Sequence, residues 1–151
     1  MKLTGNFTIL LVEDVEDDVF FMRRALRQAN ISNPLKVASD GQVAIDYLSG
    51  LGKYGDRSQY PMPSLVFLDL KMPHKNGFEV LEWIRQHREL DTLTVIVLTS
   101  SSEERDIQQT YRLGARSFLI KPPSPEMLFD LMSALKNYWL NYNEFDVLAR
   151  V

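Results

Sequence analysis

Four apolar runs in this chain lead into side chains that could take part in phosphoryl chemistry. One run ends on the carboxylate of Asp69, and another is followed by Glu13 and Asp14. Two further runs lead into the hydroxyl of Thr99 and the ammonium of Lys121. Carboxylates can hold a divalent cation, and the cation, an ammonium and a hydroxyl can together share the oxygens of a phosphoryl group. The residue types therefore predict a phosphoryl-transfer site, provided that the fold brings the four ends together.

The elements that would position these residues are short apolar runs alternating with amphipathic segments, the pattern of a parallel α/β fold. In a parallel sheet the carboxyl ends of the strands meet at one edge, where open α/β sheets bind their ligands. We predict strands at residues 7–12, 35–38, 64–69, 94–99 and 117–120. We predict helices at residues 16–29, 41–49, 76–88, 103–113 and 124–142. Each reactive residue alone could be a cap, a turn residue or a strand former, but their shared position favours function.

Local signals mark the ends of two predicted helices. Ser101 with Glu104 predicts a capping box before the fourth helix, and Gly114 predicts a left-handed residue at its end. Asp17 and Asp18 fall in the first turn of the first helix, where the macrodipole favours negative charge. We therefore expect those two acids to stabilise the helix rather than to join the site.

The strand ends also carry sequence motifs in a fixed order. The motifs are Leu10–Asp14, Leu68–Pro73 followed by Gly77, Val97–Ser100, and Gly114-Ala115 followed by Lys121-Pro122. Together they resemble the signatures of bacterial response regulator receiver domains, over about residues 6–138. The resemblance implies a (βα)5 flavodoxin-like (CheY-like) α/β fold, a doubly wound parallel sheet of order 2-1-3-4-5 with an extended C-terminal helix and tail. It also implies one receiver domain at residues 1–140 and an apolar tail at 141–151, without a separate effector domain.

The resemblance assigns the acids to a phosphorylation site. Asp69 would accept the phosphoryl group as the nucleophile of an in-line displacement. The implied cofactor is Mg²⁺, with Glu13, Asp14, Asp69 and the backbone carbonyl of Lys71 as its protein ligands. Few protein ligands are needed, because Mg²⁺ prefers octahedral oxygen coordination and keeps several waters.

The same resemblance gives roles to three residues of the last two strands. Lys121 would contact the phosphoryl oxygens with its ammonium, aimed by a cis peptide bond to Pro122. Thr99 would donate its hydroxyl to the phosphoryl group once that group is attached. Phe118 occupies the position of the aromatic switch that turns inward on phosphorylation, and it lacks the hydroxyl that a tyrosine would bring.

The predicted last helix has a wider apolar arc than one sheet face requires. Its expected core stripe is Leu128, Leu131, Leu135 and Tyr138. The rest of the arc and the apolar tail predict a homodimer or partner surface. The residues expected in that interface are Phe129, Met132, Trp139 and Leu140. The alternative is that the tail folds back on its own domain.

Bulk composition limits the classes of partner. The chain has 151 residues, of which 45% are hydrophobic and 25% charged, as in an ordinary globular domain. Its net charge of −3 provides no general attraction to nucleic acid or to an anionic membrane. There are no cysteines and no stretch of ~20 apolar residues, so we expect a cytoplasmic protein without disulfides.

The resemblance to receiver domains implies a single-domain response regulator in a phosphorelay. It would accept a phosphoryl group from a histidine kinase and act on a downstream protein, as a signalling protein rather than an enzyme. Residues 50–63 form a longer loop than such folds usually contain, and we expect either a binding loop or a tolerated insertion. This insert and the tail are similar to those of stand-alone regulators paired with phytochromes, which implies a phytochrome-type kinase.

Three other classes of protein use some of the same residue types. A phosphatase of the haloacid dehalogenase type needs a second acid two residues after its aspartate, where this chain has Lys71. A flavodoxin-like flavin binder needs a hydroxyl-rich phosphate loop after the first strand, where residues 13–16 are mostly acidic. A degenerate receiver, acting as a phosphorylation-independent adaptor, stays open as the alternative.

Overall fold

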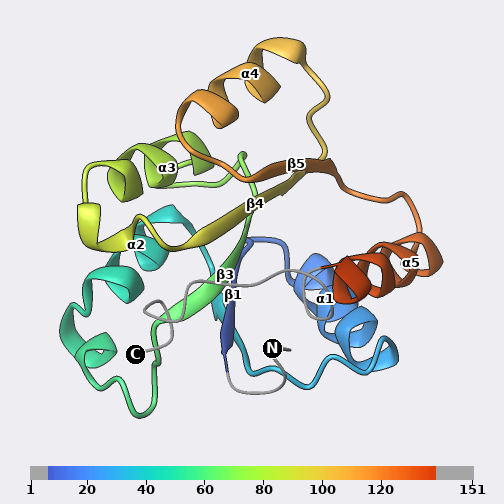
Figure 1. Ribbon diagram of the computed structural model, residues 1–151, viewed down its shortest axis with the longest axis horizontal. Helices are drawn as coiled ribbons and strands as arrows, with labels where there is room; N and C mark the ends of the chain where they lie inside the picture. The colour runs from blue at the N-terminus through green and yellow to red at the C-terminus, as the bar shows by residue number, and fades with distance from the viewer. Residues whose placement is uncertain (1–6, 139–151) are drawn as a thin grey trace.

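Five parallel strands form one twisted sheet with helices on both faces (Figure 1). The computed structural model describes residues 7–138. The strands are β1 Thr8–Val12, β2 Leu35–Ala38, β3 Pro63–Leu68, β4 Thr94–Thr99 and β5 Ser117–Ile120. Their order in the sheet is β2-β1-β3-β4-β5, and every neighbouring pair is parallel. The predicted doubly wound fold is confirmed.

The helices divide into two layers, each with its own apolar core. Helices α1 Glu16–Gln28 and α5 Pro125–Leu135 cover one face, and α2 Gly41–Ser49, α3 Gly77–Arg85 and α4 Glu104–Arg112 cover the other (Figure 1). All residues of β1, β3 and β4 are buried. A strand covered on both faces needs apolar side chains on both, which explains why these strands read as continuous apolar runs.

The helix ends follow local hydrogen bonding, with one departure from expectation. Gly114 has φ +96°, so the predicted left-handed residue after α4 is confirmed. The predicted capping box at Ser101 does not form, because α4 begins at Glu104 with Glu103 at its N-cap, so that Ser101 lies two residues before the cap. The Ser101 hydroxyl donates to Asp106 at 2.7 Å. A capping box forms instead at α3, where Asn76 and Glu79 exchange side-chain and backbone hydrogen bonds.

The segment between α2 and β3 is folded against its own domain. It contains a short 3-10 helix, Gly52–Gly55. The guanidinium of Arg57 donates to the carbonyls of Tyr47 at 2.8 Å, Leu48 at 3.0 Å and Tyr60 at 3.3 Å. The Tyr47 hydroxyl donates to the carbonyl of Pro61 at 2.8 Å. This segment leads into the N-terminal end of β3, so it lies at the opposite end of the sheet from Asp69.

The expected interface on α5 needs correction. Met132 is completely buried and Phe129 packs on the core between the sheet and α1. Helix α5 packs against both the sheet and α1, and two contact surfaces require a wider apolar arc than one. Tyr138, expected in the core, is 57% exposed. The other two expected interface residues, Trp139 and Leu140, lie outside the described residues, as does the tail at 141–151.

Among residues 7–138, no helix combines the length and the apolar character that crossing a membrane requires.

Candidate phosphoryl-transfer site

The carboxyl ends of the two central strands bring three acids together. Glu13 and Asp14 follow β1 and Asp69 follows β3, and the Asp69 backbone N–H donates to the carbonyl of Val12 at 3.1 Å. One oxygen from each of the three carboxylates lies within 4.8 Å of the others. Glu13 and Asp69 are buried, whereas Asp14 is exposed. Three carboxylates at this spacing, one of them open to water, suit a hard divalent cation that keeps part of its hydration.

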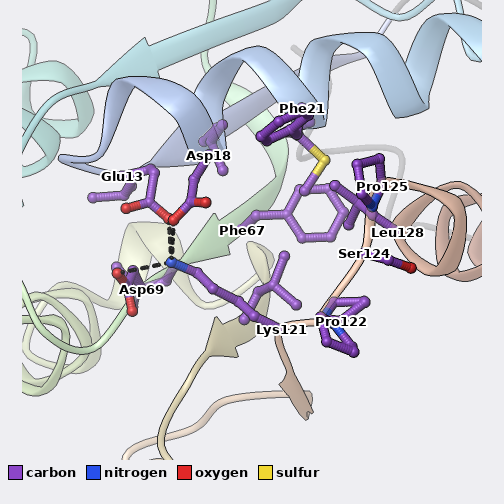
Figure 2. A pocket seen from close by; sticks show the side chains of 16 residues that line it. Glu13, Asp18, Phe21, Phe67, Asp69, Lys121, Pro122, Ser124, Pro125 and Leu128 are labelled. Carbon is purple, nitrogen blue, oxygen red and sulfur yellow. Dashed lines mark hydrogen bonds and ion pairs between the residues drawn. The ribbon is translucent and has the colours of Figure 1, made fainter.

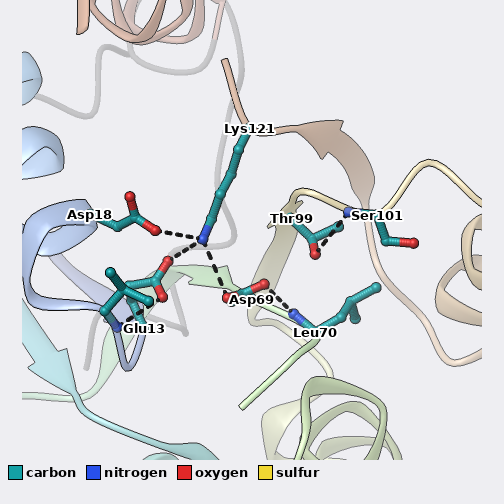
Figure 3. Close-up of polar contacts among 8 residues, drawn as sticks. Glu13, Asp18, Asp69, Leu70, Thr99, Ser101 and Lys121 are labelled. Atoms are coloured by element: carbon teal, nitrogen blue, oxygen red, sulfur yellow. Dashed lines mark hydrogen bonds and ion pairs between the residues drawn. The ribbon is translucent and has the colours of Figure 1, made fainter. Parts of the chain in front are cut away.

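Lys121 extends from the end of β5 into this group of acids (Figure 3). Its backbone N–H donates to the carbonyl of Thr99 at 2.8 Å, which fixes the start of the side chain beside β4. Its Nζ lies 2.6 Å from Glu13 Oε1, 2.9 Å from Asp18 Oδ2 and 3.3 Å from Asp69 Oδ2. The three donors of the ammonium thus face three carboxylates.

Asp18 is the residue that sequence reasoning did not assign to the site. It lies in the first turn of α1, as expected for an acid favoured by the macrodipole, but its carboxylate also binds Lys121. Asp17, next to it, is exposed. No local signal separates Asp18 from Asp17, because both lie in the first turn of α1 and the partner of Asp18 follows β5.

The crowding of negative charge changes the protonation of the site. Burial and the neighbouring charge of Asp69 raise the pKa of Glu13 to about 7, against the opposing effect of its hydrogen bond with Lys121. Burial tends to lower the pKa of Lys121, but its hydrogen bonds to Glu13 and Asp18 outweigh this and raise that pKa. Burial is the largest of the effects on Glu13, because it disfavours the charged form of a carboxyl group.

Backbone contacts hold Asp69 in place. The N–H of Leu70 donates to Asp69 Oδ1 at 2.8 Å, which leaves Oδ2 facing Lys121. The loop after Asp69 carries Lys71, whose side chain is exposed. The N–H of Gly77 donates to the carbonyl of Leu70 at 2.9 Å, so the start of α3 packs directly on the backbone of the acceptor.

The two expected switch residues lie near the site without joining it. Thr99 is fully buried at the end of β4, and its hydroxyl oxygen accepts from the N–H of Ser101 at 3.4 Å. Phe118 is partly buried against the core beneath α2 and α3. The N–H of Phe118 donates to the hydroxyl of Tyr111 on α4 at 3.1 Å. The expected cis bond before Pro122 is absent, because no peptide bond within the described residues is cis.

An apolar cavity of about 180 Å³ adjoins the acids (Figure 2). It lies between α1, the sheet and the start of α5. Its apolar walls include Phe21, Met22, Phe67 and Leu128. The carboxylates of Glu13 and Asp69 therefore border apolar side chains on this side, a setting in which charge interactions are stronger than in water.

Comparison with known proteins settles the family. The model of the response regulator receiver domain matches residues 9–133. The chain belongs to the response regulator receiver family. Accepting a phosphoryl group from a histidine kinase is the general function of such receivers, and the five-stranded fold described above is the receiver fold.

Relatives of this receiver match it over most of their own length. The probable methanogenesis regulatory protein FilR2 of Methanothrix harundinacea is 37% identical over 95% of this chain and 90% of its own. The response regulator Rcp1 of Synechocystis is 35% identical over 87% of this chain and 88% of its own.

Two solved structures extend the comparison. A Mn²⁺-bound structure of Rcp1 is 33% identical and superposes with a TM-score of 0.83, covering 93% of this chain and 99% of that one. The phosphorylated cyanobacterial phytochrome response regulator RcpA is 30% identical with a TM-score of 0.86, again covering 93% and 99%. This receiver thus resembles stand-alone phytochrome response regulators in both sequence and structure.

Proposed function

We propose that this receiver accepts a phosphoryl group on Asp69 from a histidine kinase and signals through protein contacts that depend on phosphorylation. The observation that carries the proposal is the convergence of Glu13, Asp14, Asp69 and Lys121, from three strand ends, at one edge of the sheet. The alternative, a receiver that acts as an adaptor without phosphorylation, predicts no requirement for this set of charges.

The residues present fit Mg²⁺ as the cofactor. Glu13, Asp14 and Asp69 would supply carboxylate oxygens, and the backbone carbonyl of Lys71 would complete the protein ligands. When bound, the metal supplies positive charge to the phosphoryl oxygens during transfer. Rcp1 has been crystallised with Mn²⁺, a cation that takes similar oxygen ligands.

The chemistry required of the chain is positioning and charge neutralisation. One oxygen of Asp69 forms a bond to phosphorus while the bond between phosphorus and the donor nitrogen breaks, and the donor imidazole leaves. The Leu70 N–H holds Oδ1, so the carboxylate cannot rotate freely. Lys121 neutralises charge that develops on the phosphoryl oxygens, and its pairing with Asp69 places its ammonium beside the acceptor.

The output would start from Thr99 and Phe118. The Thr99 hydroxyl accepts from the N–H of Ser101 at 3.4 Å and can donate its own proton to the new phosphoryl group, which would draw Thr99 toward Asp69. Movement at this end of β4 reaches Phe118 on the neighbouring strand, and the Tyr111 hydroxyl connects the backbone of Phe118 to α4. The face formed by α4, β5 and α5 is therefore where we expect a downstream protein to read the phosphorylation state.

The kinase proposed for this receiver is of the phytochrome type. The support is the similarity to Rcp1 and to the phytochrome response regulator RcpA over nearly the whole chain. FilR2 is as similar in sequence as Rcp1, but it is named for the regulation of methanogenesis. Similarity therefore does not select one kinase, and a panel of histidine kinases from the source organism is the test. Fastest phosphotransfer from a phytochrome kinase supports the pairing, and preference for another kinase refutes it.

Incubation with acetyl phosphate and Mg²⁺ tests the phosphorylation itself. We expect intact-mass measurement to show one added phosphoryl group, and none when excess EDTA removes the metal. The reason is that without the metal only Lys121 offsets the charge of three carboxylates, and the remaining negative charge repels a phosphoryl dianion. Absence of labelling with acetyl phosphate and with every kinase of the panel would favour the adaptor.

We also propose that the protein forms a homodimer through the face of α4, β5 and α5. The support is that each of these elements has an exposed apolar side chain, namely Tyr111, Ile120 and Met127. These three replace the buried Met132 as the expected contact residues. A symmetric dimer uses such a patch twice. Sedimentation of wild type and of an Ile120→Glu variant should show a dimer that the charge disrupts. A wild type that stays monomeric at high micromolar concentration, with and without a beryllofluoride mimic, contradicts the dimer.

A further inference from the structure

We infer that Asp18 is a positioning residue. Its carboxylate holds the ammonium of Lys121 when the metal is bound and Asp69 is not yet phosphorylated. The inference rests on the function proposed above and adds to it a residue outside the expected ligand and phosphoryl-binding set. It starts from the three ion pairs of Lys121, in which Asp18 contributes a distance of 2.9 Å to Nζ (Figure 3).

The three acids that hold Lys121 differ in what else they can bind. Glu13 and Asp69 also belong to the group of carboxylates that could share a metal ion. Asp18 does not belong to that group in the part of the chain that the structure describes. Its side chain is 41% exposed, whereas those of Glu13 and Asp69 are 3% and 8% exposed. Asp18 is therefore the member of the three that stays available to Lys121 when the other two bind a cation.

A divalent cation and the ammonium compete for the same two carboxylates. The Lys121 ammonium lies 2.6 Å from Glu13 and 3.3 Å from Asp69, so both pairs weaken when those oxygens turn to a metal. Two cations this close also repel each other. The Asp18 carboxylate gives Lys121 a partner on the α1 side of the site, which reduces both the competition and the repulsion.

The same contact has the opposite effect on the next step. Once a phosphoryl group is attached to Asp69, its oxygens need Lys121, and Asp18 competes with them for the ammonium. Asp18 should therefore favour metal binding and disfavour the engagement of Lys121 with the phosphoryl group. Opposite signs at two successive steps distinguish a positioning residue from a side chain that merely stabilises the fold.

Asp18→Asn tests the inference, with Asp17→Asn as the matched control. Both variants lose one negative charge from the first turn of α1, but Asp17 is exposed and lies outside the Lys121 contacts. Calorimetric titration should show that Asp18→Asn binds Mg²⁺ at least about threefold more weakly than Asp17→Asn does. At saturating Mg²⁺, the affinity for beryllofluoride should instead be higher in Asp18→Asn than in Asp17→Asn.

Two further variants keep the outcome decisive. In a Lys121→Met background the difference between the two asparagine variants should vanish, because the effect passes through the ammonium. Asp18→Glu keeps the negative charge and should restore the wild-type affinities for Mg²⁺ and beryllofluoride. Its thermal unfolding shows whether the fold tolerates a change at this position. Equal Mg²⁺ affinities in the two asparagine variants, a difference that persists with Lys121→Met, or changes of the same sign at both steps each overturn the inference.

The proposed function and this inference can fail separately. A wild type that neither binds Mg²⁺ nor incorporates a phosphoryl group refutes the proposed function before Asp18 is considered. A wild type that does both, with Asp18→Asn matching Asp17→Asn, refutes the role of Asp18 alone.

Discussion

Replacing Asp69 with asparagine should reduce phosphoryl incorporation to the background level of a mock reaction. An amide of nearly the same shape keeps an oxygen to accept from the Leu70 N–H, which lies 2.8 Å from Oδ1 in wild type. It lacks the negative charge that makes a carboxylate a nucleophile and a strong metal ligand.

The same substitution should stabilise the metal-free protein, which provides an independent check. The charge of Asp69 is one cause of the raised pKa of Glu13, so its removal lets that pKa move back toward its ordinary value. A folded-state pKa above the unfolded one means that stability falls as pH rises from about 4.5 to about 7. Urea unfolding across that range should show a smaller decline in Asp69→Asn than in Asp17→Asn. Full labelling of Asp69→Asn would place the acceptor on another residue.

Gly77→Ala should cost about 3 kcal/mol of stability and weaken Mg²⁺ binding as well. A methyl group on Gly77 would lie 2.8 Å from the Cα of Leu70 and would also collide with the carbonyl of Asp69. Both atoms are backbone, so the clash can be relieved only by moving the loop that holds the acceptor. In a helix without such a clash, replacing glycine by alanine would raise the stability by about 1 kcal/mol. A loss of stability in Gly77→Ala would therefore be due to the clash with the backbone of residues 69 and 70.

Gly114→Ala is the matched control for this prediction. Its φ of +96° makes any side chain strained, yet nothing lies within 4 Å of the position that a methyl group would occupy. This variant should lose stability through strain at a distance from the acceptor and keep the Mg²⁺ affinity of wild type. Chemical unfolding and calorimetry on both variants measure the two effects. A Gly77→Ala protein with wild-type stability and metal affinity would show that the loop adapts without cost.

The sequence was a good guide wherever one local property decided the structure. Strand boundaries agree to within one residue, because a strand buried on both faces shows as an unbroken apolar run. The acids and Lys121 could be placed at one edge because parallel strands share a direction. Gly114 could be placed because few other residues take its conformation readily.

Sequence reasoning failed where two elements distant along the chain decide the outcome. The buried face of α5 depends on α1, which lies more than a hundred residues earlier, so Met132 appeared to be surplus apolar surface. The role of Asp18 depends on Lys121 reaching it across the sheet edge. In each case a partner outside the local pattern was decisive.

The way Arg57 is bound implies that the 50–63 segment orders as a cooperative unit. One guanidinium holds carbonyls from the end of α2 and from within the segment, so those contacts form together or are lost together. The segment has little structure of its own besides a four-residue 3-10 helix. Arg57 shares this role with the Tyr47 hydroxyl, which donates to Pro61, and with the ring contacts of Tyr54 and Tyr60 on Tyr47, all at the end of the sheet away from Asp69. A local opening there could be sampled repeatedly without disturbing the charge balance at the other end.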